Sequence, residues 1–183
     1  DSNKSSVDDF GFIDMLIDDL LLTYNIDSTR IYATGFSNGS DMSFTLGCYL
    51  QNKIAAIAPV SGLMVHNPSA SCTLSVPIGA MMIHGTSDNS RPIDGIEGYY
   101  ASINETIEFL ASQNGMLLNP SVTDYISDGL TIELYSYPNQ ENKIYLEYYK
   151  VIDGDHYWLN IGRNGLETNQ MIWNFLSRFS SNT

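Results

Sequence analysis

Residues Ile31–Gly39 read Ile-Tyr-Ala-Thr-Gly-Phe-Ser-Asn-Gly. The first four favour a short strand, and a helix is expected from Asn38 to about Leu50, so the Gly-Phe-Ser-Asn-Gly segment falls where a strand turns into a helix. A sharp turn at such a junction lifts the serine hydroxyl off the sheet, and flanking glycines avoid backbone clashes. The helix N-terminus points at the same place, where it stabilises developing negative charge. Ser37 is therefore a candidate nucleophile, and the Asn38 amide is a candidate donor to an oxyanion.

The rest of the chain alternates strand and helix patterns, which predicts an α/β fold. Residues 54–60 and 76–83 form near-continuous apolar runs, typical of parallel strands covered on both faces, and a loop over 61–75 separates them. No internal repeat or linker interrupts the pattern. We therefore expect one domain over residues 1–183, with a mostly parallel sheet flanked by helices. Further helices are predicted over 7–24, 97–114 and 166–179, and further strands over 130–137 and 143–152.

Composition narrows the class of protein. The 183 residues include 8 Lys and Arg against 21 Asp and Glu, a net charge of −13. Such a chain repels nucleic-acid phosphates and anionic lipid, so neither partner is expected.

No apolar run is long enough to cross a bilayer. The two cysteines, Cys48 and Cys72, exclude a four-thiolate zinc site and allow at most one internal disulfide. From the residues alone, free thiols and a disulfide are both open.

A nucleophilic serine needs a base, and the base needs an acid that orients it. His156 follows the last predicted strand, and Asp88 follows the strand that ends near Ile83. Both side chains are then expected at the carboxyl ends of strands, where open α/β sheets place their sites. The order Ser37, Asp88, His156 matches one known arrangement of such a triad. Asp94 and Asp155 are rival acids, although Asp155 is too close to His156 in sequence to reach its ring easily.

The other two histidines have simpler interpretations. His84 lies at a strand end before the acid, which favours a buried structural histidine with its hydrogen bonds satisfied. His66 lies in the irregular loop, where it could border a pocket but is better explained as an exposed residue.

Several ordered motifs resemble the extracellular esterases grouped as polyhydroxybutyrate depolymerases and feruloyl esterases. They lie at Val7–Ile13, Tyr24–Asp27, Tyr32–Gly39, Ile54–Val60, Ile83–Asp88 and Gly154–Trp158. The resemblance implies an α/β-hydrolase fold, with Ser37 as nucleophile, Asp88 as acid and His156 as base. It also favours a Cys48–Cys72 disulfide and a secreted or periplasmic location. Trp158, two residues after His156, is expected to form a wall of the substrate pocket.

The expected activity is hydrolysis of carboxylic esters of the feruloyl or aryl, acetyl or polyester type, with no metal or organic cofactor. One alternative is a serine peptidase of the prolyl-oligopeptidase type, which shares the sequence His-Gly-Thr-x-Asp found at His84–Asp88. A second alternative is a catalytically impaired, hydrolase-like binding domain.

The chain departs from the family in two places. Ser40 and Asp41 stand where a second glycine is usual, which is expected to tighten packing behind the nucleophile. In the family, about four strands also precede the segment resembling residues 8–24, and a loop among them supplies a second oxyanion donor. We therefore expect an amino-terminally incomplete sheet whose first strand, near Ile31, has a free edge that pairs with another copy or with a missing segment.

Overall fold

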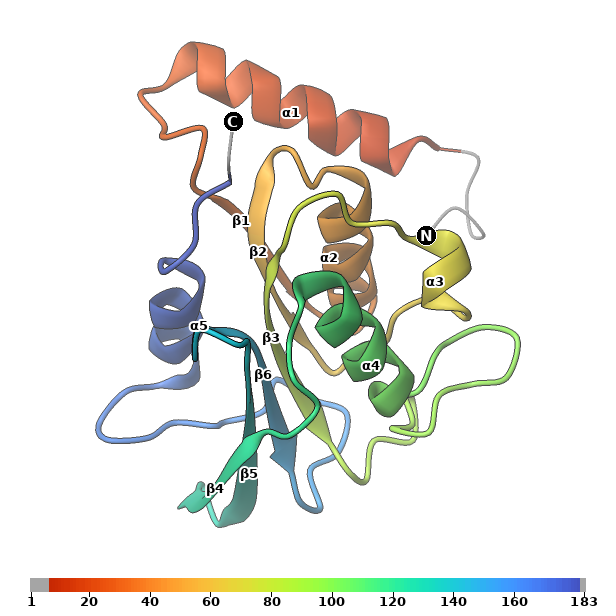
Figure 1. Cartoon of the computed structure of the whole chain (residues 1–183), viewed down its shortest axis with the longest axis vertical. Coiled ribbons are helices and arrows are strands. Elements are labelled where there is room, and N and C mark those ends of the chain that lie inside the picture. Colours follow the sequence, from red (N-terminus) through yellow and green to blue (C-terminus); the bar gives the residue numbers. More distant parts are fainter. Residues whose placement is uncertain (1–6, 182–183) are drawn as a thin grey trace.

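The computed structural model describes residues 7–181. Six strands form one sheet, and five helices flank it (Figure 1). In chain order the elements are α1 (Asp9–Thr23), β1 (Ile31–Phe36), α2 (Asn38–Tyr49), β2 (Ile54–Val60), α3 (Pro68–Ser71), β3 (Gly79–Gly85), α4 (Ile103–Asn114), β4 (Ser121–Ser127), β5 (Leu130–Pro138), β6 (Ile144–Val151) and α5 (Thr168–Leu176).

The sheet is mixed but mainly parallel, in the order β1-β2-β3-β6-β5-β4. The pairs β1–β2, β2–β3 and β3–β6 are parallel, and β5 and β4 add antiparallel strands at the far side. In the β1–β2 pair, Ile31 lies opposite Ile54 and Phe36 lies opposite Val60. β1 is one edge of the sheet. The expected pairing of this edge with another copy or with a missing segment stays a prediction.

Apolar residues cover both faces of the sheet. On one face, side chains of α2 and α4, such as Phe44 and Leu110, pack against Ile57 and Leu146. On the other face, α5 packs against residues of β2, β3 and β6. Because β2 and β3 are buried at every position, their continuous apolar sequence is explained by this double covering.

Helix α1 differs from the other long helices because none of its residues is buried. It runs across one end of the molecule in Figure 1. Phe10 stacks on Tyr49 at the end of α2, and Lys53 forms ion pairs with Asp14 and Asp18. The two carboxylates on this face of α1 therefore share the Lys53 ammonium group.

Several predicted boundaries are wrong. The helix predicted from residue 97 begins at Ile103, because Gly98 has a positive φ of 75° and Ser102 caps the helix in a capping box with Glu105. The last helix is shorter at both ends than predicted, and the third strand runs from Gly79 to Gly85 rather than over 76–83.

Two elements were missed altogether. The loop predicted over 61–75 contains the short helix α3. Strand β4 was not predicted because most of its residues are exposed, so its sequence lacks an apolar face.

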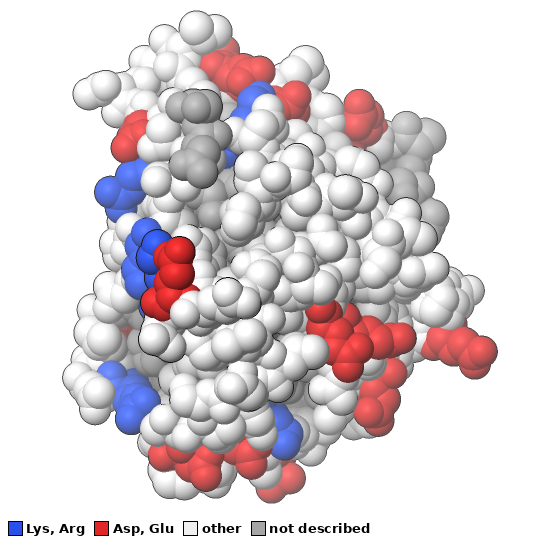
Figure 2. Space-filling model, in the orientation of Figure 1, with Lys and Arg blue, Asp and Glu red and all other residues white. Residues whose placement is uncertain are grey.

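The surface carries its negative charge in separate patches. Figure 2 shows acidic side chains gathered in several places on this face, with a broad uncharged area between them. Within residues 7–181, no helix is long and apolar enough to span a membrane.

Candidate active site

The turn after β1 holds Ser37 in an unusual backbone conformation. Its φ is 56° and its ψ is −118°, a region that most side chains avoid. The Ser37 amide donates to the carbonyl of Val60 at 3.0 Å, which ties the turn to the end of β2. A Cβ on Gly35 would lie 2.5 Å from the backbone of Gly39, so Gly35 is needed for close approach, whereas a Cβ on Gly39 would meet nothing within 4 Å.

His156 joins Ser37 to Asp88. Its Nδ1 lies 2.8 Å from Asp88 Oδ2, and its Nε2 lies 2.9 Å from Ser37 Oγ. A carboxylate only accepts hydrogen bonds, so Nδ1 carries the proton, and Nε2 is left to accept the Ser37 hydroxyl. This is the arrangement in which an imidazole can remove a proton from a serine.

The acid is held firmly in its loop. Asp88 is 3 % exposed. Its Oδ1 accepts hydrogen bonds from the amides of Ser90 and Arg91, at 2.9 and 2.7 Å. With His156 on the other oxygen, the carboxylate has partners on both sides, as a buried charge requires.

The two rival acids do not occupy this place. Asp155 Oδ1 accepts from the backbone amide of His156 at 2.7 Å, not from the ring. Asp94 is exposed and lines a different cavity. The geometry therefore selects Asp88 as the partner of the imidazole.

The other histidines lie as the sequence predicts. His84 is 1 % exposed, and its Nε2 is 2.7 Å from the carbonyl of Arg91. Burial lowers the pKa of His84, which favours the neutral ring that donates to this carbonyl. His66 is exposed in the loop before α3.

A network around Asp41 was missed by the sequence analysis. Asp41 Oδ2 accepts from Nε and Nη2 of Arg91, at 3.2 and 2.9 Å, and from the Tyr100 hydroxyl at 3.0 Å. Its Oδ1 accepts from the amide of Leu63. Arg91 also donates to the side-chain oxygen of Asn38 at 2.7 Å. This cluster joins the first turn of α2 to two loops: the loop after β2, and the loop between β3 and α4 that carries Asp88.

The charge of Arg91 is maintained despite its partial burial. Burial opposes the charged form, but hydrogen bonding and attraction to Asp41 outweigh it and raise the pKa of Arg91. The position of Asp41 after the serine motif was visible in the sequence, but its partner 50 residues away was not.

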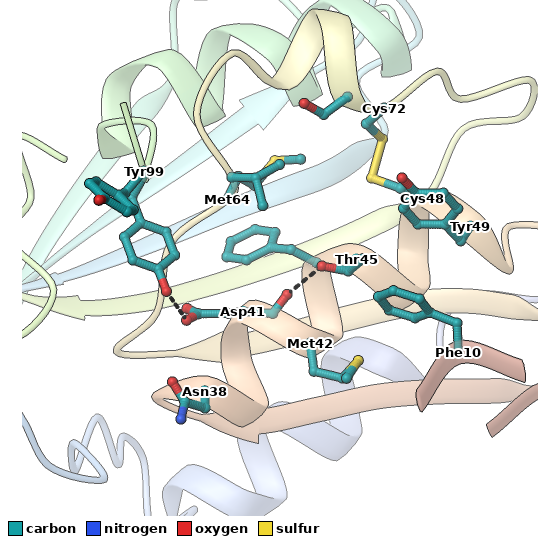
Figure 3. A pocket seen from close by; sticks show the side chains of 14 residues that line it. Phe10, Asn38, Asp41, Met42, Thr45, Cys48, Tyr49, Met64, Cys72 and Tyr99 are labelled. Carbon is teal, nitrogen blue, oxygen red and sulfur yellow. Dashed lines mark hydrogen bonds between the residues drawn. A yellow bond between two sulfur atoms is a disulfide. The ribbon is translucent and has the colours of Figure 1, made fainter. Parts of the chain in front are cut away.

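A groove begins at Asn38 and follows the outward face of α2 (Figure 3). Its volume is about 180 Å³. Most of its lining is apolar or aromatic, and the side chains come from α1, α2, the segment around α3 and the loop before α4. The residues that define it best are Phe10, Met42, Tyr49, Met64, Tyr99 and Tyr100.

A disulfide holds two sides of this groove together. Cys48 of α2 is bonded to Cys72, which follows α3, with Cα atoms 5.5 Å apart. The structure thus contains the pairing implied by the resemblance, and neither cysteine is free.

Ser40, at a position where the family usually has glycine, is fully buried. Tight packing was expected here because serine is larger than glycine. Gly62 faces it so closely that a Cβ there would lie 2.4 Å from Ser40 Cβ. Among residues 7–181, the Ser40 hydroxyl is the buried side-chain polar group that has no hydrogen-bond partner.

Residues 3–110 match the profile of the phospholipase/carboxylesterase family. This match covers more than half of the 183 residues. The chain belongs to the phospholipase/carboxylesterase family. The matched region contains Ser37 and Asp88, and the structure brings His156 to both from outside it.

Curated relatives of this carboxylesterase-family chain include esterases of fungi. A bifunctional acetylxylan esterase/xylanase of Neocallimastix patriciarum is 31 % identical over 134 residues, which is 73 % of this chain and 17 % of that protein. Feruloyl esterase D of Neurospora crassa is 33 % identical over 81 residues, 44 % of this chain and 27 % of that enzyme. The chain thus spans less than a third of the length of either relative.

Solved structures share the fold of this carboxylesterase-family chain. The crystal structure of esterase PE8 superposes with a TM-score of 0.56 at 18 % identity, covering 88 % of this chain and 57 % of that one. A thermostable esterase gives a TM-score of 0.59 at 18 % identity, over 93 % of this chain and 36 % of that one. The sheet and its helices are therefore those of an α/β-hydrolase, as predicted.

Two predicted site residues of this carboxylesterase-family chain stay predictions. Asn38 is the first residue of α2, so its amide has no carbonyl four residues earlier in the helix and is available to an oxyanion. Trp158 is 41 % exposed and does not line the groove that begins at Asn38. Its expected contact with substrate is untested.

Proposed function

We propose that this chain carries the reacting groups of a serine esterase that hydrolyses carboxylic esters. The observation that supports this most directly is the position of His156, within 3 Å of both Ser37 Oγ and Asp88 Oδ2. Membership of the carboxylesterase family supports the same reaction.

In the proposed mechanism, Ser37 Oγ attacks the ester carbonyl while His156 Nε2 removes the hydroxyl proton. The tetrahedral intermediate collapses when the imidazolium returns this proton to the leaving alcohol. Water, activated by the same nitrogen, then hydrolyses the acyl–Ser37 ester. Asp88 keeps the Nδ1 proton in place and stabilises the imidazolium through both steps.

The amides at the start of α2, Asn38 first, would stabilise the oxyanion during each tetrahedral step. Their hydrogens lack partners within the helix, and the helix dipole adds positive potential there. Arg91 supports the start of α2 indirectly. Its guanidinium donates a hydrogen bond to the Asn38 side chain, and its backbone amide donates to the Asp88 carboxylate.

We infer that the acyl group is aromatic rather than a short alkyl chain. The groove starts beside the nucleophile at Asn38, and aromatic rings and two methionines line it. Such surfaces suit a planar phenolic ring. The similarity to an enzyme named feruloyl esterase D is consistent with this substrate class, whereas the acetylxylan esterase relative supports acetyl esters as the second candidate.

We also infer that the protein works in an oxidising compartment. The Cys48–Cys72 disulfide crosslinks the groove, and such bonds persist mainly in secreted or periplasmic proteins. This supports the location implied by the family resemblance.

The decisive experiment compares Ser37→Ala with Ser43→Ala on p-nitrophenyl acetate, methyl ferulate and methyl acetate. Ser43 is a buried serine in the same helix whose hydroxyl binds the carbonyl of Gly39, so it controls for the loss of a hydroxyl. Hydrolysis should be lost in Ser37→Ala and kept in Ser43→Ala, with methyl ferulate preferred over methyl acetate. A chain that binds these esters but never hydrolyses them would instead be a binding domain.

A further inference from the structure

A second cavity lies between the antiparallel end of the sheet and α4. Its volume is about 230 Å³, and it shares no lining residue with the groove beside the nucleophile. Tyrosines of β5 and β6 line the cavity from the sheet, and Ile103 and Ile107 of α4 line it from the helix, together with Ile93 of the preceding loop. The cavity is therefore a slot with an aromatic side and an aliphatic side.

Two of its tyrosines have hydroxyls without partners. Tyr137 is 7 % exposed and Tyr148 is 5 % exposed, yet neither hydroxyl forms a hydrogen bond with any of residues 7–181. Neither hydroxyl is sealed inside the protein, since both residues line the cavity. Both hydroxyls are therefore accessible and belong to residues that line the slot.

These hydroxyls remain protonated at physiological pH. Burial raises the pKa of Tyr137 to about 12 and raises the pKa of Tyr148 as well. Water that reaches these hydroxyls can bond to them, so a ligand that displaces this water has to offer each hydroxyl a hydrogen-bond partner.

The rim of the slot carries charges of both signs. Lys150 Nζ donates to Glu133 at 2.9 Å, and Glu133 also accepts from the Tyr135 hydroxyl at 2.8 Å. Asp94 and Asn104 add an exposed carboxylate and an amide. An anion would meet Asp94 and Glu133, and a cation would meet Lys150, so the rim favours a neutral ligand that both donates and accepts hydrogen bonds.

We propose that this slot binds one neutral pyranose ring. A sugar ring presents a flat CH face to the tyrosines and hydroxyl oxygens to Tyr137 and Tyr148, while further hydroxyls reach Asp94, Asn104 and Lys150. The volume holds one ring rather than an oligosaccharide. A plain aromatic ring fits less well, because it would displace water from the two tyrosine hydroxyls and offer them no acceptor.

The test is a titration of the full chain with methyl β-D-glucopyranoside, followed by saturation-transfer NMR. Tyr137→Phe and Tyr148→Phe remove only the hydroxyls, and each should weaken binding at least five-fold. Tyr149→Phe is the matched control, because Tyr149 is the next residue of β6, is also 5 % exposed and packs on the opposite face of the sheet. It should bind like the unchanged chain.

A third variant covers the case in which a buried tyrosine variant does not fold. Asn104→Trp changes an exposed residue at the rim and should abolish binding by closing the slot. The proposal is wrong if the pyranoside shows no saturable binding to the unchanged chain. It is equally wrong if Tyr149→Phe weakens binding as much as Tyr148→Phe, or if phenol binds the slot and the pyranoside does not.

Discussion

The two sides of Ser37 are built differently. On one side, which we call the proton-transfer side, Asp88 and His156 lie in the loops after the adjacent strands β3 and β6, and His84 lies near the end of β3. Hydrogen bonds fix the positions of Asp88 and His84. On the other side, the groove over α2 is assembled from distant segments that a disulfide and the Asp41 network hold together. If the proposed function holds, we expect proton transfer to depend on the geometry of these loops and substrate choice to depend on the long-range crosslinks of the groove.

The largest effect on the rate of ester hydrolysis is expected from a change on the proton-transfer side. Asp88→Asn should lower the rate of p-nitrophenyl acetate hydrolysis by roughly 10⁴-fold, because an amide cannot hold the imidazole in the tautomer that accepts the Ser37 proton. Asp155→Asn is the control, since that carboxylate binds only the His156 amide in this loop. Equal losses in the two variants would contradict the assignment of the acid.

On the groove side, loss of the disulfide should lower both the stability of the protein and its hydrolysis of methyl ferulate. Replacing Cys48 and Cys72 together with alanine should lower the free energy of unfolding by roughly 3 kcal/mol, as expected for a crosslink across 24 residues. Chemical denaturation measures this. Hydrolysis of methyl ferulate should fall more than that of p-nitrophenyl acetate, because the small ester needs less of the groove. If both rates fall in proportion, the crosslink does not act through the groove.

Arg91 connects the two sides, so its removal should affect stability moderately. Arg91→Ala leaves the Asp41 carboxylate without its charged partner and should cost about 1–3 kcal/mol of unfolding free energy. Combining it with Asp41→Asn should cost less than the sum of the two single changes. Arg163→Ala is the control, because Arg163 stacks on the Tyr125 ring and forms no ion pair with a carboxylate in residues 7–181. Strict additivity would mean that the network is not coupled.

The smallest effect is a pH dependence from His84. Burial lowers the pKa of His84 below the ordinary histidine value of about 6.5, so the unfolded chain takes up this proton at a higher pH than the folded chain. The free energy of unfolding should therefore fall as the pH drops below about 6.5, until the folded-state pKa is passed. Denaturation of His84→Gln should show a shallower fall, and the exposed His66→Gln should follow the unchanged chain. A steeper fall in His84→Gln would refute this origin.

The sequence predicted the proton-transfer side well because its signals are local. A serine between glycines, an acid after a buried strand and a histidine after the last strand each mark a loop at the same end of the sheet. Parallel strands then bring the three loops together without further information. Asp155 was disfavoured because it is too close to His156 in sequence, whereas the final choice of Asp88 as the acid was implied by the family resemblance.

The groove side could not be predicted in the same way. Asp41 and Arg91 are separated by 50 residues, and nothing in either local sequence indicates their contact. The disulfide was open on the residues alone and was implied only by the family resemblance. Strand β4 was missed because exposure on both faces removes the alternating pattern by which a half-buried strand is recognised.

The place of β6 in the sheet has a consequence for how the molecule assembles. β6 lies between β3 and β5, although the β4–β5 hairpin precedes it in the chain. Until β6 inserts, β3 and β5 each keep an open edge, and such edges invite association with other chains. His156 lies in the loop after β6, 119 residues after Ser37. Insertion of β6 between β3 and β5 therefore covers both of these edges and also carries the loop that brings His156 to Ser37 and Asp88.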